Sequence, residues 1–348
     1  MLLNKKFALS IIIFVLILNC SSLTYGINIK KDTNSDFEKN IIYVGGNYEG
    51  SYSSIQQAID ASNDGDTIFV FEDIYYENIV IDKSIELIGE DRYNTIIHGG
   101  LSEPAVLIIK PSAVVKGFNV RNGNWGIEIR SDKNKIQENV ISNNVWRGIY
   151  LVRSDNNEIS YNEIKNNMFY GIYLVESHNN YVFENTIIYN QIGASFYLSN
   201  NNEIKYNNAS ENYIAGIEIH NSDINIFSGN IISKNEQSGV EIISDDNKNS
   251  DKNLFFKNNF SKNLLFNAYD NGENIWFNSN IKKGNHWDDY DNSLYYNVPP
   301  YKTKNIDKYP LNRVGDEKIK KVDTKYFSKG VSRHILKLLF FTKLIFNT

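Results

Sequence analysis

The sequence predicts an all-β solenoid, in which the short strands of successive coils stack as parallel sheets. Three observations predict it. A glycine recurs every 22 or 23 residues, three asparagines recur in step with it, and apolar and polar residues alternate after each glycine. A fixed period in the low twenties is typical of solenoids, and an alternation of period two indicates strands rather than helices.

The glycine column fixes the phase of the repeat. The residues one and three positions after each glycine are apolar, as Ile149 and Leu151 are, so we expect them to face the interior. Asn267 stands where the next glycine is due, and we expect this exchange because both residue types accept a left-handed backbone. The column consists of Gly126, Gly148, Gly171, Gly193, Gly216 and Gly239.

Three asparagine columns are expected to form ladders of stacked side-chain amides in the bends between strands. The first column is Asn134, Asn157, Asn180, Asn202, Asn225 and Asn253. The second is Asn139, Asn162, Asn185, Asn207, Asn230 and Asn258. The third is Asn144, Asn167, Asn190, Asn212, Asn235 and Asn263. The last step of each column is 28 residues because five residues are inserted in "SDDNKNSD". We interpret these asparagines as structural rather than as ligand-binding.

Upstream of the regular repeat, the sequence predicts a capping helix and less regular coils. The segment "YSSIQQAIDAS" places Ile55, Ala58 and Ile59 at helical spacing, which suits a helix that covers the N-terminal end of the core. Short apolar segments separated by turn residues follow it. The predicted domain spans residues 43–312 and contains about ten coils of 22 or 23 residues.

The N-terminus has the layout of a secretory signal peptide over residues 1–26, followed by a linker over 27–42. Lys5 and Lys6 precede an apolar segment that is short for a membrane span. The alternatives are an uncleaved membrane anchor and a lipid anchor on Cys20. Cys20 is the single cysteine, so a chain cleaved near Gly26 has no disulfide. We therefore expect a secreted or cell-surface protein.

The C-terminal tail, residues 313–348, is basic and then apolar. Its segment 335–346 is interrupted by Lys337 and Lys343 and is too short to span a bilayer. Three interpretations remain: a helix that caps the last coil, a helix on the membrane surface, and a disordered end. We favour a contact between 335–346 and the membrane surface.

Several motifs together resemble the NosD-like family. They are the opening "YVGG…YSSIQQAIDASNDGDTIFVFEDIYYENIVIDKSIELIGE", the asparagine repeats, the late "GNHWDDY" and the closing "IDKYPL". The family's secreted and cell-surface members are frequent in methanogenic archaea. The resemblance implies a right-handed parallel β-helix of the carbohydrate-binding and sugar-hydrolysis type, exported from the cell. It also implies the description "periplasmic copper-binding".

The metal-ligand inventory argues against copper, which is bound by clusters of His, Cys or Met. The histidines are scattered, and after residue 26 the only soft sulfur ligand is Met168. Oxygen ligands for a hard cation such as Ca²⁺ gather in two acidic segments, but neither has the glycine and distal glutamate of a calcium loop. We favour solvated acidic loops and no cofactor. The histidines are His98, His178, His220, His286 and His334, and the acidic candidates are Asp245, Asp246, Asp251, Asp288 and Asp289.

The outward residues of the strand after each glycine are the candidate ligand-binding face. Tyrosines lie at its centre and acids toward its C-terminal end, and aromatic rings repeated in every coil would suit stacking on an extended sugar polymer. The alternative is that the tyrosines only stack on one another, which we favour. The candidate residues are Tyr150, Tyr173, Tyr197, Glu218, His220 and Glu241.

Two classes of function follow. A net charge of −5 argues against a nucleic-acid partner. We favour a non-catalytic exported protein that binds polysaccharide or serves as a rigid envelope or adhesion scaffold. The alternative is a polysaccharide lyase, glycoside hydrolase or epimerase, in which Glu218 and Glu241 of adjacent coils would form a carboxylate pair. A second alternative is a NosD-like accessory role in metal maturation.

Overall fold

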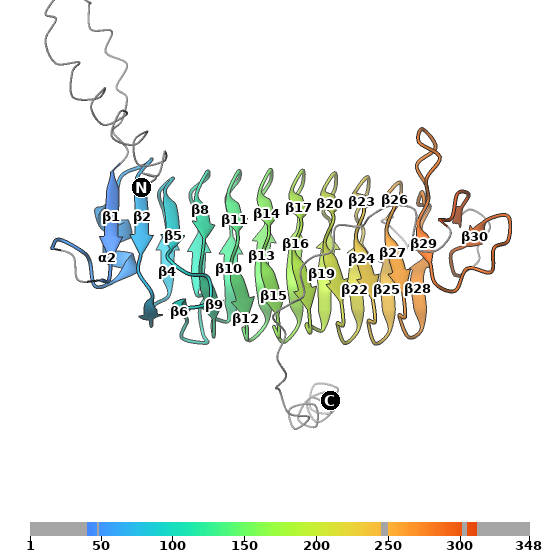
Figure 1. The fold of residues 1–348 in the computed structure, drawn as a ribbon. Helices are drawn as coiled ribbons and strands as arrows, with labels where there is room; N and C mark the ends of the chain where they lie inside the picture. Colours follow the sequence, from blue (N-terminus) through green and yellow to red (C-terminus); the bar gives the residue numbers. More distant parts are fainter. Residues whose placement is uncertain (1–39, 47–48, 245–249, 301–304, 312–348) are drawn as a thin grey trace, which may run out of the picture. The chain divides into compact units, whose positions relative to one another are not determined.

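The computed structural model describes residues 40–46, 49–244, 250–300 and 305–311. Over these residues the chain forms the expected right-handed parallel β-helix (Figure 1). The expected signal peptide, nearly all of the linker and the tail lie outside the described residues, as do Asp245 and Asp246. The first strand, β1, begins at Ile41, two residues before the expected domain boundary at Tyr43.

Each coil contributes one strand to each of three parallel sheets. The first ten-stranded sheet contains β1 (Ile41–Val44), β2 (Thr67–Val70), β5 (Glu86–Gly89), β8 (Val114–Lys116), β11 (Lys135–Gln137), β14 (Glu158–Ser160), β17 (Tyr181–Phe183), β20 (Glu203–Lys205), β23 (Ile226–Ser228) and β26 (Leu254–Phe256). The second contains β3 (Asp73–Tyr75), β6 (Thr95–His98), β9 (Asn119–Arg121), β12 (Val140–Ser142), β15 (Glu163–Lys165), β18 (Thr186–Ile188), β21 (Asn208–Ser210), β24 (Ile231–Ser233), β27 (Asn259–Ser261) and β29 (His286–Trp287).

The third sheet has nine strands and carries the glycine column, so we call it the glycine sheet. Its inward residues, such as Ile149 and Leu151, are fully buried as expected. They stack on the equivalent residues of adjacent strands and form a continuous apolar core. The strands are β4 (Ile79–Ile81), β7 (Val106–Ile108), β10 (Trp125–Ile129), β13 (Arg147–Val152), β16 (Tyr170–Val175), β19 (Ile192–Tyr197), β22 (Ala215–His220), β25 (Ser238–Ile243) and β28 (Phe266–Asp270).

The asparagine ladders are confirmed. In the second column, the Asn185 side chain donates to Asn207 Oδ1 at 3.0 Å and also to the Ile159 carbonyl at 2.8 Å. The backbone N–H of Asn185 donates to the same Asn207 oxygen. The ladder continues past the predicted column through Asn285, which accepts from Asn258. Each buried amide therefore replaces its lost water contacts with bonds to two neighbouring coils.

The residue before a ladder asparagine provides the tight bend. It adopts a left-handed backbone, for example at Glu184 (φ 52°) and Tyr206 (φ 57°). The glycines of the glycine column do not, so our reason for that column was wrong. A Cβ on Gly148 would lie 2.6 Å from the Gly171 carbonyl oxygen and 2.8 Å from Asn167 Nδ2. Close approach to the next coil, rather than a left-handed backbone, requires glycine there.

Asn267 also stands in the glycine column for a different reason from the one expected. It is not among the described residues with positive φ. Its side chain instead ends the third ladder, because Asn267 Oδ1 accepts from Asn263 Nδ2 at 3.0 Å. Asp288 and Asp289 accept from Asn267 Nδ2, each at 2.8 Å, so the last amide of this ladder is fully bonded.

Both ends of the core are covered. At the N-terminal end lies α2 (Ile55–Ala61), whose Ile55, Ala58 and Ile59 are buried as predicted and whose first turn is capped by Ser54. At the C-terminal end Trp276 and Trp287 stack on the last phenylalanines of the core. The antiparallel strands β30 (Tyr296–Asn297) and β31 (Ile306–Asp307) follow them.

Candidate functional site

The outward residues of the glycine sheet form one aligned row. The strands pair in register, so each outward residue lies beside its counterpart in the next coil. Parallel strands are about 4.8 Å apart, which sets the spacing of the row. The row contains Glu128, Tyr150, Tyr173, Ser195, Glu218 and Glu241.

The tyrosines of this row use their ring faces on one another. The rings of Tyr150 and Tyr173 stack with centroids 5.8 Å apart and planes 14° apart. Tyr173 also stacks on Tyr170, at 4.5 Å and 11°. The rings therefore stack on one another in the free protein. Tyr197 is exposed, but among the described residues its ring does not contact these tyrosines.

The hydroxyl groups of Tyr150, Tyr170 and Tyr173 make no hydrogen bond within the described part of the chain. Burial raises the pKa of all three phenols, and that of Tyr173 to about 12. The hydroxyls therefore stay protonated at neutral pH and can both donate and accept. What this surface offers a ligand is a group of phenolic hydroxyls rather than open ring faces.

Arg147 lies among these rings, and no pattern in the sequence selects it. Its guanidinium carbon is 4.4 Å from the Tyr150 ring centroid, 4.9 Å from that of Tyr173 and 5.6 Å from that of Trp125. Three aromatic faces hold the cation by cation–π attraction. Arg147, Trp125 and Tyr170 are outward residues that precede the glycine column by one position. We name Trp125, Arg147, Tyr150, Tyr170 and Tyr173 the tyrosine–arginine patch.

Glu128 neutralises the next arginine of the same face. Its carboxyl is buried, and Oε1 accepts from Arg130 Nε at 2.7 Å, whereas Oε2 has no partner. Burial raises the pKa of Glu128, although Arg130 and Arg147 act in the opposite direction. An open hollow of about 440 Å³ lies here, between the patch and the two neighbouring arginines. It is lined by Trp125, Glu128, Arg130, Tyr150, Val152 and Arg153.

The acidic end of the row has a different chemistry. Glu218 accepts from the buried Ser195 hydroxyl at 2.8 Å and lies 3.4 Å from His220 Nε2. Burial and then the charge of Glu218 raise the pKa of Glu241, which His220 partly offsets. The structure therefore brings Glu218, His220 and Glu241 together. The charge of Glu218 also adds to burial in raising the pKa of Tyr170 and Tyr173. A carboxyl with a raised pKa beside a hydrogen-bonded carboxylate has the form of an acid–base pair.

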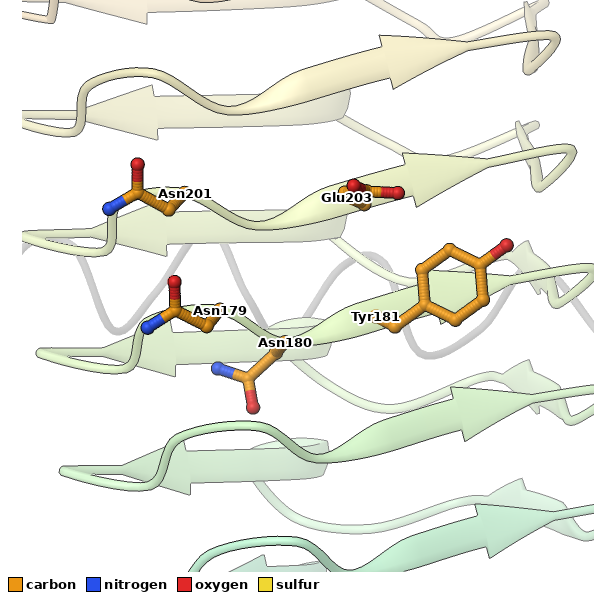
Figure 2. A pocket seen from close by; sticks show the side chains of 5 residues that line it. All are labelled: Asn179, Asn180, Tyr181, Asn201 and Glu203. Atoms are coloured by element: carbon orange, nitrogen blue, oxygen red, sulfur yellow. The ribbon is translucent and has the colours of Figure 1, made fainter.

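A second hollow, of about 420 Å³, lies over β17 and β20 of the first ten-stranded sheet (Figure 2). It is lined by Asn179, Asn180, Tyr181, Asn201 and Glu203 from two adjacent coils. Asn180 is buried and bonded to Asn202, and Asn179 and Asn201 are left-handed bend residues. We place the candidate site on the glycine sheet because the patch combines three phenolic hydroxyls with an arginine held between rings, whereas the charged residue of this hollow, Glu203, is paired with Lys205.

The described acidic candidates for a hard cation bond to the fold itself. Asp251 accepts from the Glu273 backbone N–H at 2.7 Å. Asp288 accepts from Lys262 N–H and Asp289 from Asn267, as part of the C-terminal end of the stack. Among the described residues, no three His, Cys, Asp or Glu side chains gather as a metal-binding group.

The described histidines do not fit copper. His98 bonds to Asn122, and His178 Nδ1 accepts from the Asn200 backbone N–H. His220 faces Glu218, and His286 bonds to Asn259. They belong to separate coils, and Met168 is exposed at a bend. His334 lies outside the described residues. These donors do not form the clustered soft-ligand set that copper requires.

Two solved structures are similar to the chain in fold. One is the pectate lyase Pel9A, with a TM-score of 0.54, 15% identity, and coverage of 66% of this chain and 78% of that one. The other is an alginate lyase from Paenibacillus sp. str. FPU-7, with a TM-score of 0.51, 13% identity, and coverage of 68% and 99%. At these identities the similarity establishes the fold alone. No curated protein matches the chain.

Two further findings bear on location and family. The described residues include no helix with the length and apolar character needed to cross a membrane. The family model described as "Periplasmic copper-binding protein (NosD)" matches residues 59–292, which is most of the β-helix. The chain therefore belongs to the NosD family.

Proposed function

We propose that this chain is an exported, non-catalytic β-helix protein that binds polysaccharide across its glycine sheet. The observation that carries the proposal is the tyrosine–arginine patch. Three phenolic hydroxyls without protein partners lie in adjacent coils beside a guanidinium that is held between rings. Sugars present dense hydroxyl groups, so a row of amphipathic tyrosines suits them. The two similar solved structures are named as lyases of pectate and alginate.

A repeated surface suits a repeated ligand. Because the strands are in register, successive coils present chemical groups at a constant step of about 4.8 Å. An extended polymer can therefore contact several coils at once, and its affinity grows through multivalent contact. The expected signal peptide over 1–26 supports export, and the periplasmic family description is consistent with an extracytoplasmic location. A chain that keeps residues 1–26 in the cytosol would contradict export.

The test measures binding of the purified protein to a panel of soluble polysaccharides by affinity electrophoresis. We expect retardation by at least one polymer, and loss of that retardation in a triple variant, Tyr150→Phe, Tyr170→Phe and Tyr173→Phe. These changes remove the hydroxyls but keep the rings, so the fold is preserved. Tyr206→Phe is the matched control, because Tyr206 is exposed on a bend away from the glycine sheet. Full binding by the triple variant would overturn the proposal.

A second function is favoured by the acidic end of the same row. The raised pKa of Glu241 beside Glu218 supports a glycoside hydrolase, with Glu241 as the acid and Glu218 as its carboxylate partner. Release of reducing ends from the bound polymer would support it. Loss of that release in Glu241→Gln, with binding unchanged, would separate catalysis at this end from binding at the tyrosine–arginine patch.

A further inference from the structure

Arg147 differs from its neighbouring arginines in having no carboxylate partner. Arg130 Nε bonds to Glu128 Oε1 at 2.7 Å, and Arg153 Nε bonds to Glu176 Oε2 at 2.8 Å. Within the described part of the chain Arg147 forms no salt bridge and no side-chain hydrogen bond, and its buried Nε lacks a partner. Arg130 and Arg153 are therefore each paired with a carboxylate, whereas Arg147 interacts with Glu128 only at longer range.

The guanidinium of Arg147 is also held in place. Trp125, Tyr150 and Tyr173 surround it at ring-centroid distances from 4.4 to 5.6 Å. A long arginine side chain normally loses rotamer freedom when it binds a ligand. Here the rings have already imposed that loss in the free protein, so binding an anion costs less. A planar guanidinium also matches a carboxylate through two parallel N–H···O bonds.

We propose that the polysaccharide bound by the tyrosine–arginine patch is anionic, and that Arg147 receives a carboxylate of one of its uronate units. This inference rests on the proposed function, because it names the class of saccharide bound at the same site. The hydroxyls of Tyr150, Tyr170 and Tyr173 then bond to the hydroxyls of that sugar and its neighbours. Arg147 supplies one positive charge and the three tyrosines supply neutral donors. Together they match a polymer whose sugars each carry one carboxylate and several hydroxyls.

The row also limits where such a polymer can bind. Glu218 lies three strands beyond Tyr150, or about 14 Å at the spacing of parallel strands. Glu218 and Glu241 would repel further carboxylates, and only His220 offsets their charge within these two strands. The anionic segment is therefore restricted to β10, β13 and β16, beside Arg147, and does not extend to the acidic end of the sheet.

The experiment compares polyuronates with versions from which the charge has been removed. Polygalacturonate and alginate are each used alongside a carboxyl-reduced counterpart, which keeps the backbone and replaces each carboxylate with a hydroxymethyl group. Binding is followed by the fluorescence of the wild-type protein, because Trp125 belongs to the patch. We expect at least one polyuronate to bind about tenfold or more tightly than its reduced counterpart.

Two arginine variants locate the effect. Arg147→Gln should lose about tenfold or more in affinity for that polyuronate, and Arg147→Lys should recover only part of it because it lacks the planar fork. Lys135→Gln is the control, since Lys135 is exposed, is paired with Glu158 and lies on β11, away from the glycine sheet. It should stay within about twofold of the wild type. Circular dichroism confirms that each variant is folded.

The outcomes separate this inference from the proposed function. Equal affinity for a polyuronate and its reduced counterpart, or an equal loss in the Arg147 and Lys135 variants, overturns the inference and leaves saccharide binding intact. Binding of neutral polymers alone also overturns it. Failure to bind every charged and neutral polymer overturns the proposed function, and the inference with it.

Discussion

Asn185 Oδ1 accepts two hydrogen bonds from Asn162, one from its backbone N–H and one from its side-chain amide, each at 3.0 Å. This double acceptance recurs along all three ladders. It means that one side-chain oxygen satisfies two buried donors of the preceding coil. The ladder therefore satisfies backbone donors of the neighbouring coil as well as side-chain donors.

Replacing Asn185 with alanine should lower the free energy of unfolding by about 1–3 kcal/mol, because it leaves buried donors of Asn162 without an acceptor. Urea denaturation measures the change. Asn280→Ala is a useful comparison, because Asn280 is exposed, lies outside the ladders and does not have a positive φ. Equal and negligible losses for both variants would contradict the structural role of the ladder.

Gly171→Ala should be destabilising although the backbone of Gly171 is not left-handed. A Cβ there would lie 2.5 Å from both the Gly193 carbonyl oxygen and Ile187 Cγ2, so adjacent coils must move apart. Overpacking of this kind costs about 1–3 kcal/mol, measured as a shift of the denaturation midpoint. Gly100→Ala is the control, because its nearest contact is the Asn78 side chain at 3.1 Å. A larger loss at Gly100 than at Gly171 would refute the close-approach explanation.

Asp270 should make the C-terminal end of the β-helix sensitive to pH. It is buried and accepts from Trp276 Nε1 at 2.8 Å, and burial raises its pKa to about 6. The folded-state pKa exceeds the unfolded value near 4, so the stability contributed by Asp270 is full below pH 4. It is lost as the pH rises toward 6. The loss is about 3 kcal/mol for a shift of two pKa units.

The measurement is the difference in unfolding free energy between the wild type and Asp270→Asn, whose side chain does not titrate. Between pH 4 and pH 7, we expect the wild type to lose about 3 kcal/mol of unfolding free energy relative to the variant. Asp307, whose pKa is also raised by burial, is present in both proteins, so its contribution to the pH dependence cancels in the difference. If the difference stays constant with pH, or if the wild type gains stability relative to the variant as the pH rises, the predicted pH dependence is wrong.

Deletion of residues 330–348 tests the tail. Trp276 and Trp287 already cover the C-terminal end of the core, so the shortened protein should stay monomeric and equally stable. If 335–346 contacts the membrane surface, the deletion should also move the protein from the membrane fraction to the soluble fraction. Aggregation would instead support a capping role, and no change in location would contradict the membrane contact.

The fold could be predicted because its signal repeats. In a column such as Asn139 to Asn258, asparagine recurs at the same position of every coil although neighbouring residues vary. The apolar residues also keep the same positions after each glycine. One column was missed: serines three positions before the first asparagine column form a fourth ladder, in which Ser177 N–H donates to Ser199 Oγ at 3.1 Å. These serines share one phase as well, so the sequence contained this signal.

The candidate site was only partly predictable. The sequence placed Tyr150 and Tyr173 on one face, but it could not tell whether their rings face a ligand or each other. Trp125, Arg147 and Tyr170 share a column whose residue type changes in every coil, so periodicity does not mark it. Their importance comes from contacts between coils, which only the three-dimensional arrangement provides.

A crystal structure with a bound oligosaccharide would show whether polysaccharide binds across the glycine sheet at the tyrosine–arginine patch. The ligand is an oligomer of whichever polymer retards the wild-type protein. We expect sugar density within hydrogen-bonding distance of the hydroxyls of Tyr150 and Tyr173, over β13 and β16. Density confined to the hollow over β17 and β20, or to another face of the β-helix, would contradict it.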